Sequence, residues 1–231
     1  TSAISSVFDV IDVDQDTQIE APGTQITNGS FEAADHTPAG TPIDVFRFDI
    51  RDQGTSDGLS TFVSQINLVA ATANTANLQQ HINTITLSDG TNTFTPDAVS
   101  ITADEISLDF STNTIEVSDN STLSLTATIT LNETGIQDNS IIALEVDTAD
   151  HQFQASTLGS NFEESQGNGV ISGPQITLTV TATELQFTTQ PSNTLVNVTM
   201  SPSVEIAATD ANGNIDLDYG QIIELTSAGP S

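Results

Sequence analysis

The chain has 231 residues, with 31 acidic residues against two arginines and no lysine, which gives a formal net charge of −29 at pH 7. A surface this negative repels phosphate groups, so the composition argues against nucleic-acid binding and against an anionic membrane as partner. The chain has no cysteine, which excludes disulfides and thiolate metal sites, and no apolar run approaches the ~20 residues of a membrane-spanning helix. Charged residues make up only 14% of the chain, so we expect a folded protein rather than an acidic disordered one.

The first predicted unit is an N-terminal segment, residues 1–40. Its stretch VFDVIDVDQDTQIE, residues 7–20, is typical of one strand followed by a turn, and little nearby sequence could pair with that strand. We therefore expect this segment to be a linker, the end of a preceding module, or a strand that is donated to another unit.

The second predicted unit, residues 41–182, is a complete β-sandwich. Its residues alternate between apolar and polar, as in VFRFDIR, where Phe46, Phe48 and Ile50 share one face. Gly, Asn and Asp turn signals separate the runs, and only residues 72–82 favour a helical turn or two. The predicted strands comprise residues 45–51, 62–69, 82–88, 106–110, 114–117, 123–131, 141–146 and a run that starts at 176.

The third predicted unit begins near Thr183. Residues 183–231 contain three or four strand patterns, fewer than the about seven of an immunoglobulin-like sandwich. The predicted fold class is therefore all-β, with β-sandwich modules of Ig-like or Greek-key type in tandem and an incomplete C-terminal module.

Calcium is the cofactor that the composition favours, as a structural ion, and the main candidate site is TDANGNIDLDYG, residues 209–220. Oxygen-bearing side chains occupy alternate positions, and a turn that presents them can supply several of the oxygen ligands that Ca²⁺ needs. An EF-hand loop that starts at Asp210 would need glycine sixth and glutamate twelfth, and the chain has Ile215 and Gln221 there. A hairpin closed by the Asn-Gly turn is the other interpretation, and it is compatible with a bound ion. The candidate ligands are Asp210, Asn212, Asn214, Asp216 and Asp218.

Two further candidate sites have weaker patterns. Asp12, Asp14 and Asp16 would suit Ca²⁺ between modules, although a solvated acidic strand face is the slightly favoured interpretation. The acids around RDQGTSDG, residues 51–58, form another group of possible ligands: Asp49, Asp52 and Asp57.

The residues needed for catalysis are scarce. The three histidines are far apart in sequence, there is no cysteine or Gly-x-Ser-x-Gly nucleophile motif, and the chain has no tryptophan and one tyrosine, Tyr219. We therefore expect a protein that is not an enzyme. The same shortage of aromatic residues weakens, without excluding, a glycan-binding function.

Two stretches resemble a known kind of surface protein. DVFRFDIRDQGTSDGLSTFVSQINL (44–68) with HINTITLSDGT (81–91), and LQFTTQPS continuing to SPSVEIAATDANGNIDLDYG (185–220), are similar to tandem β-sandwich and Ig-like modules of large Bacteroidetes proteins. The resemblance implies secretion by the type IX route, an extracellular or cell-surface location, and a gliding or attachment role. It also makes Thr148, in Asp-Thr-Ala, a candidate O-glycosylation site.

Three functions are compatible with these patterns. The leading one is a non-enzymatic stalk, spacer or adhesin whose partners are neighbouring modules, identical subunits, surface glycans or other cells. The second is a fibre subunit polymerised by strand complementation, with residues 5–13 as donor. The third is a calcium-dependent module that binds a glycan or another ligand.

Overall fold

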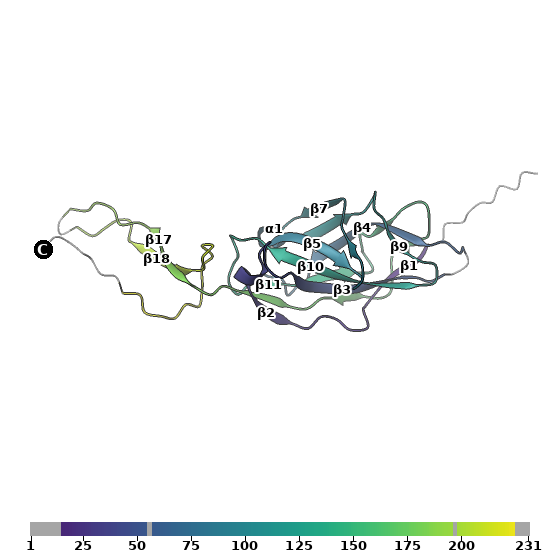
Figure 1. Cartoon of the computed structure of the whole chain (residues 1–231), viewed down its shortest axis with the longest axis horizontal. Helices are drawn as coiled ribbons and strands as arrows, with labels where there is room; N and C mark the ends of the chain where they lie inside the picture. The colour runs from purple at the N-terminus through teal and green to yellow at the C-terminus, as the bar shows by residue number, and fades with distance from the viewer. Residues whose placement is uncertain (1–14, 55–56, 196–197, 225–231) are drawn as a thin grey trace, which may run out of the picture.

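The computed structural model describes residues 15–54, 57–195 and 198–224. The fold is all-β: a large β-sandwich is followed along the long axis by a separate two-stranded hairpin (Figure 1). Within the described part of the chain, no helix is long and apolar enough to cross a lipid bilayer.

The first sheet of the sandwich is centred on two long strands, β3 and β10. They pair antiparallel with Leu125 opposite Phe48, and β10 pairs on its other side with β5. Both long strands alternate buried apolar with more exposed polar residues, as their sequences predict. In spatial order the sheet consists of β14 (Asn161–Phe162), β1 (Gln15–Glu20), β3 (Ile43–Asp52), β10 (Thr122–Leu131), β5 (Ile82–Ser88) and β6 (Thr93–Phe94).

The second sheet is centred on β4. Its path is β15 (Val170–Ser172), β12 (Leu144–Asp147), β4 (Thr61–Ala70), β8 (Glu105–Asp109) and β7 (Ala98–Ile101), with β13 (Gln154–Ala155) and β9 (Ile115–Val117) also paired to β4. A smaller sheet contains β11 (Ile141–Ile142), β16 (Ile176–Thr179) and β2 (Gly29–Glu32). Two short helices complete the unit, the 3₁₀ turn η1 (Ala33–His36) and α1 (Leu78–His81).

The hydrophobic core lies between the sheets. Phe46 and Phe48 of β3 stack with their ring centroids 5.6 Å apart, and Phe48 meets Phe153 edge to face. Both β3 rings are fully buried, so truncation of either to alanine removes about 3–5 kcal/mol of stability. The alternation predicted for residues 45–51 is thus the inner face of the central strand.

The start of the described chain belongs to the sandwich, which corrects the prediction of a separate segment over residues 1–40 for its described part, residues 15–40. β1 pairs antiparallel with β3 and parallel with β14, and β2 pairs parallel with β16. The partners β14 and β16 follow β1 and β2 by about 145 residues, and β3 follows β1 after a long loop. The local sequence therefore did not reveal these pairings. The predicted donor strand, residues 5–13, lies outside the described residues.

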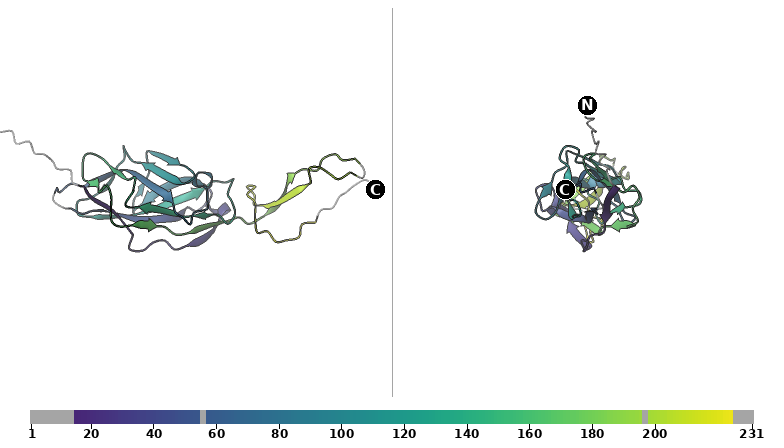
Figure 2. Two further views of the ribbon diagram at one scale, coloured as in Figure 1. Left: turned by 180° about the vertical axis from the view of Figure 1, so that it is seen from behind. Right: turned by 90° about the vertical axis from the view of Figure 1, so that its right-hand side faces the viewer.

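The C-terminal unit is an antiparallel pair, β17 (Glu184–Thr189) and β18 (Glu205–Thr209), with Leu185 opposite Ala208. Within the described residues this pair is the whole sheet, and views from front and back show it beyond one end of the sandwich (Figures 1 and 2). The sandwich strands end at Thr179, so four residues connect the two units.

Candidate functional site

The candidate site is the place where the hairpin meets the sandwich. We call it the joint and define it as the connecting residues 180–183, the sandwich loop 132–138 that follows β10, and residues 210–218 that follow β18.

The connecting residues have all four backbone N–H groups bonded. Val180 N–H donates to Asp138 Oδ1 at 2.8 Å, and Ala182 N–H donates to Asp216 Oδ2 at 2.9 Å. Thr181 donates through its backbone and its hydroxyl to the two carboxylate oxygens of Glu32, at 3.0 and 2.7 Å. Thr183 N–H donates to the carbonyl of Thr209 at 2.8 Å. Carboxylates from three separate segments therefore hold this short connection.

The turn after β18 is built around the carboxylate of Asp210. Asp210 Oδ1 accepts the backbone N–H groups of Asn212 and Asn214, both at 2.9 Å, and Oδ2 accepts the side-chain amide of Asn214. Gly213 has φ +83°, a left-handed conformation that glycine adopts without steric cost. After the turn, Ile215 forms an antiparallel β-bridge with Thr209. The predicted Asn-Gly turn is thus present.

Asn214 joins this turn to the sandwich. Its Oδ1 accepts the backbone N–H of Ile136 at 2.9 Å, and its Nδ2 donates to the carbonyl of Glu133 at 2.9 Å. The side chain is 4% exposed, so a buried amide crosses the interface with both of its polar atoms bonded. We call these two hydrogen bonds, from Asn214 to Ile136 and to Glu133, the Asn214 bracket. Breaking them is costly, because each freed buried group would lose its partner without regaining a bond to water.

Asp138 makes the matching contact from the sandwich side. Besides Val180, its carboxylate accepts the backbone N–H of Leu217 at 3.0 Å and the side-chain amide of Asn139 at 3.1 Å. Asp138 is 3% exposed. One buried carboxylate therefore bonds the end of the sandwich, the connection and the hairpin loop together.

The sandwich loop of the joint is supported by α1. Gln80 Nε2 donates to the carbonyl of Gly135 at 2.7 Å, and Asn132 N–H donates to the carbonyl of His81 at 2.9 Å. The buried His81 ring has Nδ1 2.7 Å from the carbonyl of Asn77, and its Nε2 accepts the N–H of Gln137 at 3.1 Å. These bonds place the proton on Nδ1 of a neutral ring, and burial lowers the pKa of His81 below its usual 6.5.

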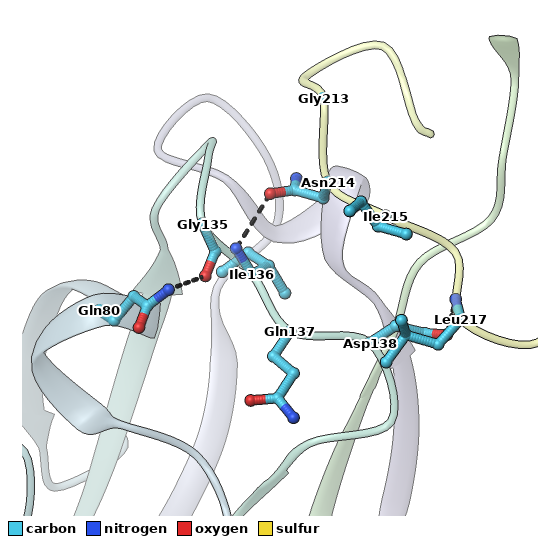
Figure 3. A pocket seen from close by; sticks show the side chains of 9 residues that line it. All are labelled: Gln80, Gly135, Ile136, Gln137, Asp138, Gly213, Asn214, Ile215 and Leu217. Atoms are coloured by element: carbon cyan, nitrogen blue, oxygen red, sulfur yellow. Dashed lines mark hydrogen bonds between the residues drawn. The ribbon is translucent and has the colours of Figure 1, made fainter. Parts of the chain in front are cut away.

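A cavity of about 290 Å³ lies in the joint, between loop 132–138 and the residues after β18 (Figure 3). The Asn214 amide points across it to the N–H of Ile136, and Ile215 and Leu217 line the hairpin side. Ile215 is 43% and Leu217 62% exposed. The two units therefore meet mainly through directed polar bonds.

Carboxylates gather at the joint. Oxygen atoms of Asp138, Asp216 and Asp218 lie within 4.8 Å of one another, and no other group of three or more Asp, Glu or His side chains in the described ranges is this close. Carboxylate oxygens are the ligands that Ca²⁺ prefers, so this set has the chemistry of a divalent-cation site.

The five ligands predicted in residues 210–218 have different positions. Asp216 and Asp218 belong to the carboxylate group, with Asp216 half-buried and Asp218 exposed. Asp210 and Asn214 are buried and bonded within the turn and to the sandwich, and Asn212 is exposed on the outside of the turn. The structure thus divides the predicted set between a metal-type cluster and a structural bracket.

Among the described residues, the other acidic candidates Asp16, Asp52 and Asp57 do not join this cluster. Asp12 and Asp14 lie outside the described residues. Asp16, on β1, is 3% exposed, so it is not part of a solvated face, and it lies near the fully buried Asp52. Asp57 accepts the N–H of Leu59 and the hydroxyl of Ser160, both at 2.9 Å. Asp16, Asp52 and Asp57 lie at the end of the sandwich opposite the joint, because β1 pairs with the C-terminal end of β3.

Thr148 does not fit its predicted modification. Its side chain is fully buried, and its hydroxyl donates to the carbonyl of Gly169 at 2.9 Å. A glycosylation enzyme cannot reach such a hydroxyl in the folded chain, which corrects the prediction.

The sequence interpretation missed Asp138 and Glu32. Asp138 is one acid in the loop sequence ETGIQDNS, and Glu32 ends a short strand that was not predicted. Neither belongs to a motif, so only the sheet pairing that brings residues 32, 138 and 182 together reveals their role.

Comparisons with known proteins give no family. The sequence matches no protein-family model and no curated protein. Among solved structures, the chain is similar to the self-complemented form of MyfA, the major subunit of Myf fimbriae from Yersinia enterocolitica. The identity is 10% and the TM-score 0.28, over 71% of this chain and 98% of that one. Similarity at this level does not extend to function, and the β-sandwich class follows from the sheets themselves.

Proposed function

We propose that the chain is a non-enzymatic structural segment of an extracellular surface protein, and that it acts as a stiff spacer within a stalk or adhesin. The observation that carries this proposal is the connection between the two units. All four of its N–H groups are bonded, three of them to the carboxylates of Glu32, Asp138 and Asp216.

A stalk needs joints that keep their direction. A free linker samples many orientations because its backbone groups bond water equally well in all of them. Here a change of orientation would break bonds from the connection and from the Asn214 bracket, at about 0.5–1.5 kcal/mol net for each. The joint therefore favours one relative orientation of sandwich and hairpin.

The composition supports a location outside the cell. Proteases that cleave after lysine or arginine have two target residues in the chain, Arg47 and Arg51. Both lie within the ten-residue central strand β3, where backbone pairing to β10 protects them from a protease active site. The resemblance of residues 44–68, 81–91 and 185–220 to Bacteroidetes surface modules supports export by the type IX route as part of the same proposal.

A structural calcium ion at the joint is also part of the proposal. Asp138, Asp216 and Asp218 repel one another across short distances in a chain that is already strongly negative. Ca²⁺ would remove this repulsion and lock the hairpin loop to the sandwich. The glycan-binding alternative is less well supported, because Phe153 and Phe162, which line one of the cavities, are buried and offer no exposed ring face.

Two experiments test the function. Backbone ¹⁵N relaxation should give one common tumbling time for amides of the sandwich and of β17–β18, and a much shorter time for the hairpin would contradict a stiff spacer. Antibodies against the purified chain should label intact cells of the source organism without permeabilisation, and labelling only after permeabilisation would contradict the surface location.

A further inference from the structure

The outer strand of the hairpin has an uncovered apolar face. Leu185 and Phe187 of β17 are 49% and 46% exposed, and they lie on the same face as Ile206 and Ala208 of β18. On the opposite face Glu184 pairs with Thr209 and Gln186 with Ala207, so that face is mainly polar. A two-stranded sheet with one apolar face is marginal in water, since stable sheets need further strands or a covering layer.

The backbone of β17 also has an open edge. Among the residues that the structure describes, β17 pairs only with β18, so the N–H and C=O groups on its other side have no strand partner. Five of its six residues are exposed, whereas β18 is partly buried at its joint end. An open edge beside an uncovered apolar face is the combination that accepts an added strand.

The N-terminal segment has the composition of such a strand. Five of the seven residues from 7 to 13 are apolar, and they are Val7, Phe8, Val10, Ile11 and Val13. These are β-branched or aromatic residues, which favour extended backbone. The two intervening residues are Asp9 and Asp12, so the segment is not a fully apolar strand that would require burial on both faces.

The start of β1, to which the segment is connected, and the open edge lie at opposite ends of the described part of the molecule. Thr17 pairs with Asp52, so β1 starts at the C-terminal end of β3, whereas the joint follows the end of β10 that pairs with Ile43. The views of Figures 1 and 2 agree, with β1 at one end and β17 beyond the other. At about 3.3 Å per residue, crossing β3 takes ~30 Å, whereas Val7 is eight residues from the start of β1 and so at most ~26 Å from it. The apolar residues 7–13 therefore cannot lie along β17 of their own chain.

We propose that residues 1–14 of one copy add as a strand to the open edge of β17 in a second copy, so that the chain assembles head to tail. This inference rests on the proposed function, because it names a second copy as the partner of the spacer. The donor is attached at the end of the sandwich opposite the acceptor, so the contact is heterologous and does not close on itself, and the product is a linear fibre. The donor carries Asp9 and Asp12 and the acceptor Glu184, so added salt should strengthen the assembly.

Two variants and a control test the proposal by sedimentation velocity and negative-stain imaging in high salt. The intact chain should form species larger than 24.2 kDa whose size rises with concentration. Deletion of residues 1–14 removes the donor, and Phe187→Asp places a charge on the acceptor face. Both variants should stay monomeric. Leu158→Asp adds the same charge at an 82% exposed position of the sandwich and should assemble as the intact chain does.

Mixing the two variants separates assembly from misfolding. The deletion variant keeps its acceptor and Phe187→Asp keeps its donor, so an equimolar mixture should form 1:1 heterodimers and nothing longer. A monomeric intact chain at high concentration and high salt would overturn the proposal, as would assembly that survives the deletion or a mixture without heterodimers. The relaxation measurement above is independent of these outcomes, so a stiff monomer would overturn this inference and leave the spacer function standing.

Discussion

Asn214 and Ile136 are 78 residues apart in sequence and joined by a hydrogen bond of 2.9 Å, from the backbone N–H of Ile136 to Oδ1 of Asn214. The same amide donates to the carbonyl of Glu133, so one side chain of the hairpin turn holds two backbone groups of the sandwich loop. The sequence DANGN, residues 210–214, therefore does more than form a turn, because its last residue, Asn214, bonds the hairpin to the sandwich.

Asn214→Ala should loosen the joint and leave the sandwich intact. It leaves the buried N–H of Ile136 without its partner, at a cost of about 1–3 kcal/mol. Tyr219 is the only tyrosine and there is no tryptophan, so tyrosine fluorescence reports on the hairpin loop. In urea, the fluorescence midpoint should fall while the circular-dichroism midpoint of the sandwich changes little. Asn212→Ala, in the same turn but exposed, should change neither, and equal effects of the two variants would refute the bracket.

Calcium should stabilise the chain through the joint. An ion at about 100 times its Kd adds about 2.7 kcal/mol, which raises the Tm of a protein of this size by roughly 5–10 °C. EDTA should reverse the rise, and Asp216→Asn should abolish it. Asp150→Asn, the same charge change at an exposed sandwich position, should retain it. If millimolar calcium leaves the Tm unchanged, the cluster of Asp138, Asp216 and Asp218 is not a calcium site.

His81 should make stability fall in mild acid. Its folded pKa is lowered by burial, so below pH 6.5 the unfolded chain takes up the proton first. The free energy of unfolding should therefore decrease by up to about 1.4 kcal/mol per pH unit until the folded ring is protonated. His81→Gln has no such titration, so the difference in stability between wild type and variant should shrink from pH 7 to pH 5. A constant difference would contradict the neutral buried ring.

Asp52 should make the free energy of unfolding decrease as the pH rises, which is opposite to the effect of His81 and occurs at lower pH. Burial raises its pKa and the nearby Asp16 carboxylate adds to this, against hydrogen bonds from Thr61, Asn120 and Gly54. Its contribution is therefore fully present below pH 3.8 and is lost as pH rises through the folded pKa. In urea titrations at several pH values, the free energy of unfolding of Asp52→Asn should increase relative to that of wild type as the pH rises through the folded pKa of Asp52. The exposed Asp104→Asn should show no such trend, and a flat Asp52→Asn difference would show that burial does not raise this pKa.

The sandwich strands were predictable because the sequence signals that define them, apolar–polar alternation and turn residues, are local. Residues 82–88 were predicted as a strand and form β5 with the same ends, and β3, β4 and β10 differ from prediction by one or two residues. Alternation fixes which face is buried, and the turn residues fix where each strand stops. β1 and β2 were not assigned to the sandwich, because a short strand is defined by distant partners such as β14 and β16.

The joint was predictable only in part. The spacing of Asp216 and Asp218 is a recognisable pattern of oxygen ligands, and both lie in the carboxylate cluster. The same spacing placed Asp210 and Asn214 in the ligand set, although a buried turn uses their polar atoms instead. Asp138 and Glu32 have no sequence signature, because what they bind is backbone N–H, which every residue except proline offers.

The most direct test of the account is the distance between the two units. The chain has no cysteine, so Ser100→Cys on β7 and Thr188→Cys on β17, both exposed, accept one spin label each without background. Double electron–electron resonance should give one narrow distance distribution, which should broaden in Asp216→Ala because Ala182 then loses its acceptor. A broad distribution in the otherwise unchanged chain would contradict the central claim that carboxylates hold the hairpin in one orientation on the sandwich.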